Sequence, residues 1–152
     1  MAQADVLQAI HHRLDQPWCR LVTIVGRRGA GKARLAAAVA HHRAGQYGDG
    51  VWLVPPPTRD AGEAEPAQTL AVAIAAILDL PLLVSRKPSQ QVLDYLQEKE
   101  MMLVLLDIPR ATADIELVLA IVQHCRGVQL LVTADEALHL RAEWVIVWGT
   151  EG

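Results

Sequence analysis

A short segment near the N-terminus combines glycines and a lysine at the spacing of a loop that holds phosphate. The segment GRRGAGKARL, residues 26–35, has glycines at Gly26 and Gly31 and a lysine at Lys32. Glycines let the backbone curl closely around an anion, and the lysine neutralises phosphate oxygens. We therefore expect the phosphates of a nucleotide to bind here. The predicted contacts are Gly26, Arg27, Arg28, Gly29, Ala30, Gly31, Lys32, Ala33 and Arg34.

The residue after the lysine departs from this pattern. A loop that supports hydrolysis has serine or threonine there, whose hydroxyl is a direct ligand of magnesium, but this chain has Ala33. Phosphate binding needs no such ligand, because backbone N–H groups, a helix dipole and Lys32 hold the anion. Arg27 and Arg28 either add positive charge to the loop or are solvated side chains on a surface turn, and the second interpretation is preferred.

A carboxylate at the end of another apolar segment is the second candidate. The run MMLVLLD, residues 101–107, is a buried strand by its composition and ends at Asp107. In a P-loop ATPase an acidic residue at this place holds the magnesium shell through water. Asp107 is therefore the predicted residual Walker B acid and the predicted metal contact, whereas by itself such an aspartate is often a turn residue or a helix cap. The next residue is Ile108, where a second acid or amide commonly orients the attacking water.

The elements that must position these residues alternate along the chain. Apolar, β-branched runs predict strands, and segments of helical periodicity predict helices, with Ser89 as a candidate cap of the fourth. This alternation predicts an α/β fold of three layers, with a five-stranded parallel sheet flanked by helices. The predicted strands cover 19–25, 50–54, 101–107, 128–133 and 143–148. The predicted helices cover 4–14, 32–43, 66–80, 85–100 and 111–125, with a short helical stretch at 135–141.

Composition agrees with this fold class. Hydrophobic residues make up 52% of the chain but aromatic residues only 4%, so the core must be aliphatic, as in parallel strands that helices cover on both faces. The 152 residues predict a single domain over 1–152, with an N-terminal helix in 1–17 and a P-loop core in 18–148. No apolar run reaches transmembrane length and the N-terminus does not resemble a signal peptide, so we expect a cytoplasmic protein without membrane contact.

The charge distribution favours a phosphate ligand over nucleic acid. The net charge is -3, yet residues 1–43 carry seven basic side chains against two acidic ones. A positive first third attracts phosphate, while the acidity of the whole chain makes nucleic acid an unexpected partner.

Other residue types suggest structure and not chemistry. Cys19 and Cys125 show no ligand spacing and are predicted to be buried, inert thiols. The pairs at 11–12 and 41–42 are histidines predicted to lie on the surface. Trp144 and Trp148 are expected to cover the core from one face of a strand.

The order of the motifs resembles that of the STAND class, the signal-transduction ATPases with numerous domains, and more narrowly the NB-ARC-like domains of bacterial multidomain regulators. The resemblance runs through RLVTIVGRRGAGKARLAAAVA, YGDGVWLVPP, VLDYLQEKEMM with the following LVLLD, and VQLLVTADEALHLRAEWVIV. It implies an ATP/ADP switch in which the loop strand lies at the centre of the sheet beside the sensor strand. It also implies protein partners or further domains of a signalling assembly, and a possible homo-oligomer.

The same resemblance exposes three departures. Ala33 replaces the hydroxyl residue, Ile108 replaces the second acid, and the stretch that typically reads Thr-Ser-Arg-Glu in the family reads Thr133-Ala134-Asp135-Glu136 here. Thr133 keeps the family residue and joins the predicted nucleotide contacts. Asp135 reverses the charge of the sensor arginine that would meet the terminal phosphate. The resemblance thus implies ATP or ADP as the ligand, weakened magnesium binding and no other cofactor.

Three functions follow from these observations. The first is a degenerate STAND-type domain that binds ATP or ADP in signalling, with little or no hydrolysis. The second is a pseudo-NTPase that no longer binds nucleotide and keeps the fold as an interaction or oligomerisation surface; an arginine of the loop folded onto Asp107 would favour it. The third and least favoured is an active ATPase that recruits magnesium through water and borrows an arginine from a neighbouring subunit.

Overall fold

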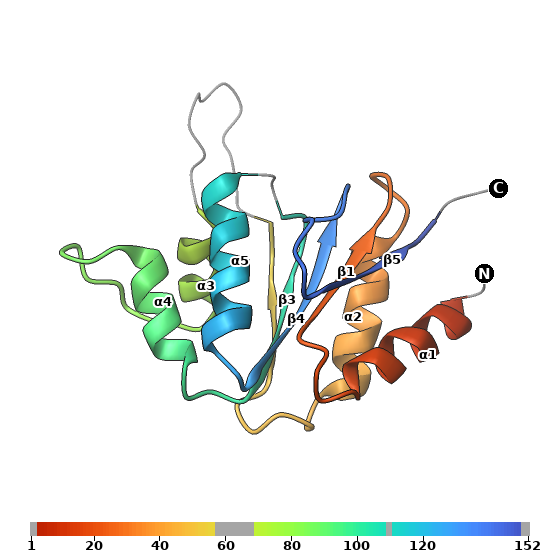
Figure 1. The fold of residues 1–152 in the computed structure, drawn as a ribbon, viewed down its shortest axis with the longest axis horizontal. Helices are drawn as coiled ribbons and strands as arrows, with labels where there is room; N and C mark the ends of the chain where they lie inside the picture. The colour runs from red at the N-terminus through yellow and green to blue at the C-terminus, as the bar shows by residue number, and fades with distance from the viewer. Residues whose placement is uncertain (1–2, 57–68, 109–110, 150–152) are drawn as a thin grey trace.

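The chain folds into a three-layer α/β structure, which confirms the predicted fold class (Figure 1). This computed structural model describes residues 3–56, 69–108 and 111–149. The helices are α1 (Gln3–Leu14), α2 (Lys32–Arg43), α3 (Leu70–Ile77), α4 (Pro88–Leu96) and α5 (Thr112–His124). The strands are β1 (Leu21–Val25), β2 (Val51–Val54), β3 (Met101–Leu105), β4 (Val128–Ala134) and β5 (Glu143–Val147). Part of the helix predicted at 66–80 lies outside the described residues.

The five strands are parallel and lie in the order β2-β3-β4-β1-β5. The loop strand β1 therefore lies beside β4, the sensor strand, as the family resemblance implied. The central position of the sheet belongs to β4, with β1 next to it, which corrects the expectation that the loop strand is central. The registers pair Val25 with Ala134 and Leu105 with Val132, so the segments that follow β1, β3 and β4 leave the sheet at one edge.

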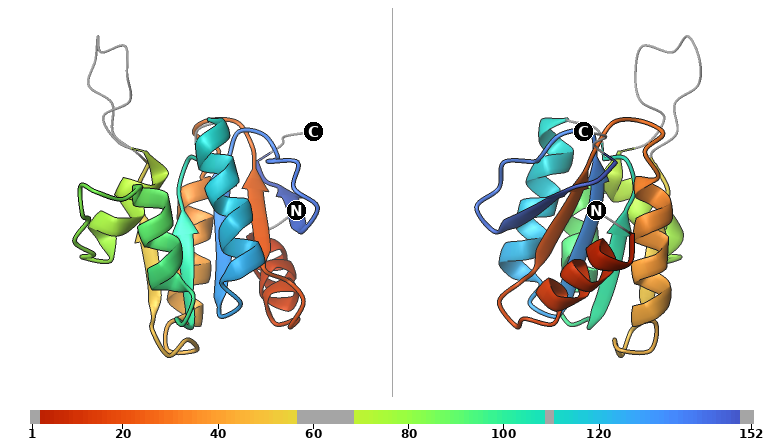
Figure 2. Two further views of the ribbon diagram at one scale, coloured as in Figure 1. Left: turned by 60° about the vertical axis from the view of Figure 1, so that its left-hand side comes forward. Right: turned by 90° about the vertical axis from the view of Figure 1, so that its right-hand side faces the viewer.

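The three inner strands β1, β3 and β4 are buried on both faces because helices cover each side, whereas the edge strands β2 and β5 are partly exposed. Helices α1 and α2 pack on one face, and α3, α4 and α5 on the other (Figure 2). Alternate residues of β3 enter the two cores, with Met102 and Val104 toward α1 and α2, and Leu103 and Leu105 toward the other three helices. This arrangement confirms the aliphatic core that the composition predicted.

The helix starts differ in how their free N–H groups are satisfied. The Oγ1 of Thr69 accepts the N–H of Val72 and caps α3. Helix α4 begins at Pro88, and Ser89 lies inside the first turn, so the prediction that Ser89 caps this helix is wrong. Proline is tolerated at this position because the first N–H of a helix has no intrahelical partner. Helix α2 follows Gly31 without any side-chain cap, which leaves its first N–H groups available to a ligand.

The helical stretch predicted at 135–141 is wrong, because this segment is irregular. The carboxylate of Glu143 accepts the N–H groups of Leu138 at 2.9 Å and His139 at 3.0 Å. Leu138 is buried in the core, and His139 adopts a left-handed φ of 62° that ends any helical turn. The tertiary contacts of Leu138 and Glu143 thus override a weak local helical pattern.

Helix α1 is tied to α2 by a buried cation. Arg43 is only 5% exposed and donates to Asp15 Oδ1 at 2.9 Å and to Tyr47 Oη at 3.0 Å. Its guanidinium also approaches Nδ1 of His11 at 3.4 Å. His11 is half-buried and its Nε2 has no partner within the described structure, so the prediction that all four of these histidines lie on the surface is wrong for His11.

The predictions for cysteine and tryptophan are confirmed. Cys19 and Cys125 are buried free thiols, and burial raises the pKa of both, which keeps them protonated and inert. Trp144 and Trp148 both pack against the core on the α1 and α2 face of the sheet.

Candidate functional site

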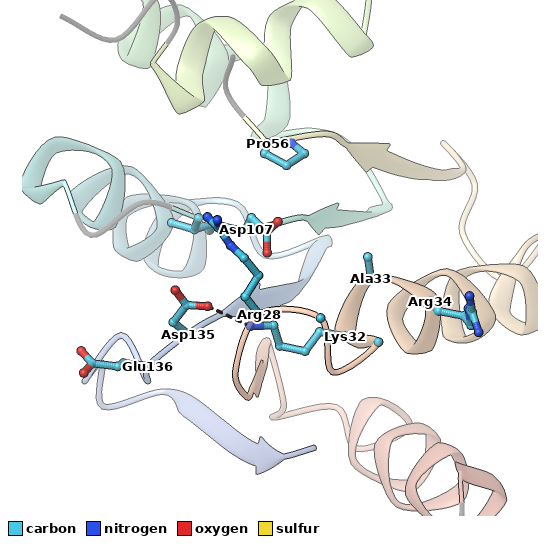
Figure 3. Close-up of a pocket in the computed structure, with 11 residues that line it drawn as sticks. Arg28, Lys32, Ala33, Arg34, Pro56, Asp107, Asp135 and Glu136 are labelled. Carbon is cyan, nitrogen blue, oxygen red and sulfur yellow. Dashed lines mark hydrogen bonds and ion pairs between the residues drawn. The ribbon is translucent and has the colours of Figure 1, made fainter. Parts of the chain in front are cut away.

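One cavity collects most of the residues that the sequence singled out. It has a volume of about 890 Å³ and lies where β1, β3 and β4 end and α2 begins (Figure 3). Residues far apart in the chain therefore meet at one edge of the sheet, as parallel strands require. The lining consists of Arg28, Gly29, Gly31, Lys32, Ala33, Arg34, Pro56, Asp107, Ile108, Asp135 and Glu136.

The backbone of the loop between β1 and α2 is shaped for close approach to a ligand. Gly29 and Gly31 have left-handed φ angles of 83° and 91°, which other residues rarely adopt. The N–H of Ala30 donates to the carbonyl of Arg27 at 3.2 Å and closes a turn. The first N–H groups of α2, at residues that line the cavity, have no intrahelical acceptor, and the helix dipole makes this end positive.

Two predicted contacts of the loop lie away from the cavity and support its shape. A Cβ atom on Gly26 would lie 2.3 Å from the carbonyl oxygen of Trp148, and one on Gly149 would lie 2.5 Å from Cβ of Ala30. The N–H of Trp148 also donates to the carbonyl of Val25 at 2.8 Å. The segment after β5 thus packs directly against the back of the loop, and neither Gly26 nor Ala30 lines the cavity.

The ammonium of Lys32 is already fully hydrogen-bonded inside the protein. It donates to the carbonyl oxygens of Gly26 and Ala134, the latter at 3.2 Å, and to Oδ1 of Asp135 at 3.0 Å. An ammonium has three N–H donors, so these acceptors use all of them. The Lys32 side chain is 5% exposed, whereas that of Asp135 is 75% exposed (Figure 3). Sequence reasoning singled out both residues but not the ion pair between them.

Asp107 lies two residues beyond the end of β3, in a turn held by β4. The N–H of Asp107 donates to Oγ1 of Thr133 at 2.8 Å, and the N–H of Ile108 donates to the carbonyl of Thr133 at 3.1 Å. Asp107 is exposed and has a left-handed φ of 50°. Thr133 is fully buried and does not line the cavity, so its role in this structure is to position Asp107.

The buried environment of position 108 explains why no second carboxylate follows Asp107. Its side chain is 5% exposed and belongs to the core beneath α3, α4 and α5. A carboxylate there would be desolvated without a counter-ion, which is strongly unfavourable. Position 108 therefore serves packing in this chain.

The charged side chains around the cavity are balanced in number. Arg28, Lys32 and Arg34 come from the loop and α2, while Asp107, Asp135 and Glu136 follow β3 and β4. Arg27 is exposed and does not line the cavity. Figure 3 shows the Arg28 side chain extending toward Asp107, although no ion pair joins the two within the described ranges. The excess of positive charge that the first third of the sequence suggested is offset locally by carboxylates.

Two lining residues were missed by sequence reasoning. Pro56 follows β2 by two residues, and Glu136 follows Asp135 after β4. A signal for both existed, because every segment that leaves the carboxyl end of a parallel strand reaches the same edge of the sheet.

Neither a metal-binding cluster nor a membrane span is found in the part of the chain that the structure describes. No three His, Cys, Asp or Glu side chains in these ranges lie close enough together to hold one metal ion. None of the helices in these ranges has both the length and the hydropathy needed to cross a bilayer.

Comparison with known proteins identifies the fold. The sequence matches no protein-family model and no curated protein. Similar solved structures include Cdc6p from Pyrobaculum aerophilum, which is 17% identical with a TM-score of 0.63 over 96% of this chain and 45% of that one. A chain of Drosophila ORC bound to AT-rich DNA and Cdc6 is 12% identical with a TM-score of 0.56, over 96% and 53% of the two chains. Caenorhabditis elegans PCH-2 is 14% identical with a TM-score of 0.54, over 99% and 42%.

These similar structures have the P-loop fold of nucleotide-binding ATPases. The present chain spans about half the length of the first two. At such low identity the likeness concerns the fold, and this chain has the fold of a P-loop NTPase.

Proposed function

We propose that this protein is a STAND-type nucleotide-binding domain that binds ATP or ADP and hydrolyses it slowly or not at all. In this proposal it acts in cytoplasmic signalling through contacts with other domains or proteins. A single domain is proposed, with α1 in residues 1–17 and the P-loop core in residues 18–148. The observation that carries the proposal is the cavity at the start of α2, where a glycine loop and Lys32 are intact but Asp135 is paired with that lysine.

Several properties of the cavity support nucleotide binding. Its volume of about 890 Å³ falls within the range of roughly 300–1,000 Å³ that small-molecule sites occupy. The left-handed Gly29 and Gly31 bring the backbone close to the cavity, and the uncapped start of α2 offers N–H donors to an anion. Arg28 and Arg34 are exposed, line the cavity and add positive charge to it.

Magnesium fits the cavity less well than phosphate does. Ala33 lines the wall without an oxygen, and the hydroxyl of Thr133 is buried and accepts the N–H of Asp107. Asp107 alone offers an exposed carboxylate at the expected place. A magnesium ion, which prefers six oxygen ligands, would therefore depend on water and on the phosphates of the nucleotide.

Slow hydrolysis follows from the same residues. The direct magnesium ligand is replaced by Ala33, the water-orienting residue by the core residue Ile108, and the sensor cation by Asp135. One lost electrostatic contact in a catalytic site raises the barrier by about 2.7–4 kcal/mol. A carboxylate at position 135 adds repulsion, because negative charge on the transferring phosphoryl group needs cationic partners.

Calorimetric titration of the purified protein with ADP and with ATP, with and without magnesium, tests the proposal. We expect saturable binding of nucleotide that Lys32→Ala weakens at least tenfold. Because Lys32 also holds two backbone carbonyls, the variant must first be shown to be folded by circular dichroism. No heat at millimolar nucleotide, from folded wild-type protein, would contradict nucleotide binding.

A second function, a pseudo-NTPase that serves as an interaction or oligomerisation module, is favoured by one observation. The donors of Lys32 are saturated by internal acceptors, so the loop is complete without a ligand. This function predicts a silent titration together with a concentration-dependent mass in analytical ultracentrifugation. The third function, an active ATPase, predicts phosphate release that Lys32→Ala abolishes.

Nucleic acid belongs among the partners to be tested. The net charge of -3 argues against it, but the similar Drosophila ORC structures are described as bound to DNA, so the fold does not support that exclusion. Fluorescence anisotropy with a labelled DNA duplex, at several salt concentrations, decides the question because phosphate contacts make such binding strongly salt-dependent.

A further inference from the structure

The three acceptors of the Lys32 ammonium differ in how easily a ligand can displace them. The carbonyls of Gly26 and Ala134 belong to the backbone, next to a pair of strands held in register. The third acceptor is the side chain of Asp135, which is 75% exposed and can rotate into solvent. A phosphate that reaches Lys32 must replace one acceptor, and the Asp135 carboxylate is the one whose departure leaves the backbone unchanged.

We propose that Asp135 is an internal ligand of Lys32 that competes with phosphate and gives the site a preference for nucleoside diphosphates over triphosphates. This inference rests on the proposed nucleotide-binding function and names the residue that sets its specificity.

The distribution of charge within the cavity supports this preference. The uncapped N–H groups belong to the start of α2, whereas the carboxylates of Asp107 and Asp135 follow the ends of β3 and β4. Figure 3 shows Asp135 directed toward Lys32 and Asp107 reaching into the same space, which Arg28 also enters, while Glu136 is directed away. A diphosphate held by the loop can stay close to the start of α2. A third phosphate would have to extend toward the carboxylates, and like charges at such close range repel.

The alternative is that Asp135 is only a counter-ion that keeps Lys32 folded against the loop. The two roles differ in what removal of the charge does. A specificity residue changes the ratio of the ADP and ATP affinities, whereas a purely structural counter-ion changes stability and leaves the ratio constant. Asp135→Asn separates them, because asparagine keeps an oxygen that can accept from Lys32 but has no charge.

The ion pair itself is tested first, without any nucleotide. The lysines of the chain are Lys32, Lys87 and Lys99, so a proton–nitrogen NMR spectrum of protein labelled at lysine nitrogen is simple to assign. We expect a protected ammonium signal from buried Lys32, and a shift of this signal in Asp135→Asn. An unchanged Lys32 signal in that variant would overturn the inference whatever the protein binds.

Specificity is then measured by calorimetry with ADP and ATP in the absence of magnesium. We expect the wild type to bind ADP roughly fivefold more tightly than ATP, the size allowed by one solvent-exposed charge. In Asp135→Asn both affinities should rise, that of ATP more, so that the ratio approaches one. Glu98→Gln is the matched control, because it removes an exposed carboxylate at the amino end of β3, away from the cavity, and should leave the ratio unchanged.

Each outcome separates this inference from the proposed function. Binding of both nucleotides with the same ratio in wild type and Asp135→Asn overturns the inference and leaves nucleotide binding intact. Binding in Asp135→Asn but not in wild type would show that the carboxylate blocks the site completely, which overturns both the ADP preference and nucleotide binding by the wild type. No binding in either folded protein overturns the proposed function, and the specificity inference falls with it.

Discussion

The ammonium of Lys32 lies 3.0 Å from the carboxylate of Asp135, although 103 positions separate the two residues in the sequence. The lysine is buried at the loop after β1, and the aspartate is exposed just beyond β4. Because β1 and β4 are neighbours in the sheet, the segments that follow them bring the Asp135 carboxylate against the lysine of the glycine loop.

Reversing the charge of Asp135 should destabilise the protein without nucleotide and increase the stabilisation that ATP provides. In Asp135→Arg the buried Lys32 loses its counter-ion and gains a cationic neighbour, so we expect the free energy of unfolding to fall by roughly 1 kcal/mol. Urea denaturation with and without ATP measures both effects. Glu98→Arg introduces the same charge change at a distant exposed position and should alter neither quantity by a comparable amount. A stable variant that ATP does not stabilise further would contradict this account of the pair.

Restoring the missing hydroxyl should strengthen magnesium-dependent binding but not turnover. Ala33 lies exposed in the first turn of α2, so Ala33→Thr is sterically easy and provides one oxygen ligand for the metal. Ile108 and Asp135 still lack the groups that orient water and stabilise the transferred phosphoryl group. Phosphate release measured over hours should therefore stay near the background rate. Robust turnover from this single change would show that the other two departures matter little.

Two buried threonines provide a paired test of how Asp107 is held. Thr133→Val removes the hydroxyl that accepts the N–H of Asp107, so we expect a loss of about 1 kcal/mol in the free energy of unfolding. Magnesium-dependent nucleotide binding should weaken as well, since Asp107 loses its fixed position. Thr23→Val is the matched control, because Thr23 is equally buried and its hydroxyl has no partner within the described structure. That variant should be neutral or stabilising; equal losses in the two variants would contradict the assigned role of Thr133.

The contact behind the loop should influence nucleotide affinity from outside the cavity. Gly149→Ala places a methyl group 2.5 Å from Cβ of Ala30, in a residue whose φ is 78°. We expect the displaced loop to bind nucleotide at least tenfold more weakly in calorimetry. Gly45→Ala is the control for backbone strain without a steric clash, because Gly45 has a similar φ of 93° and open space around it. The control should lose about 1–2 kcal/mol of stability from strain and no nucleotide affinity. If both variants bind nucleotide as the wild type does, the segment after β5 does not shape the loop.

Acid should destabilise the contact between α1 and α2. Burial, assisted by the charges of Arg43 and His42, lowers the pKa of His11 from its ordinary value of 6.5, while Asp15 acts weakly in the opposite direction. The unfolded chain therefore binds more protons than the folded one just below this value, and stability falls as the pH falls through it.

Thermal denaturation between about pH 8 and about pH 5 measures this effect, because that range spans the titration of histidine. We expect His11→Asn to flatten the loss of stability on the acid side, whereas the same change at the exposed neighbour His12 should leave the wild-type profile. Identical profiles for wild type and His11→Asn would exclude His11 as the titrating group.

The local sequence pattern was sufficient to predict the helices and strands whose residues strongly favour one conformation. Helix α2 occupies residues 32–43 as predicted, because its alanine-rich sequence has high helix propensity and follows a glycine turn. The five strands also lie where β-branched, apolar runs predicted them, with ends that differ by one or two residues. In contrast, segment 135–141 was predicted wrongly, since contacts of Leu138 with the core and of Glu143 with two N–H groups decide its conformation.

The sequence by itself determined the fold class and most of the residues that gather at the cavity, because these depend on neighbours within one element and on the common edge of parallel strands. Only the tertiary structure decided that Lys32 is paired with Asp135, that Thr133 holds the turn at Asp107, and that Trp148 packs behind the loop. These contacts join strands that are adjacent in the sheet but distant in the chain. Their geometry depends on sheet order and side-chain packing, which residue type and local spacing do not specify.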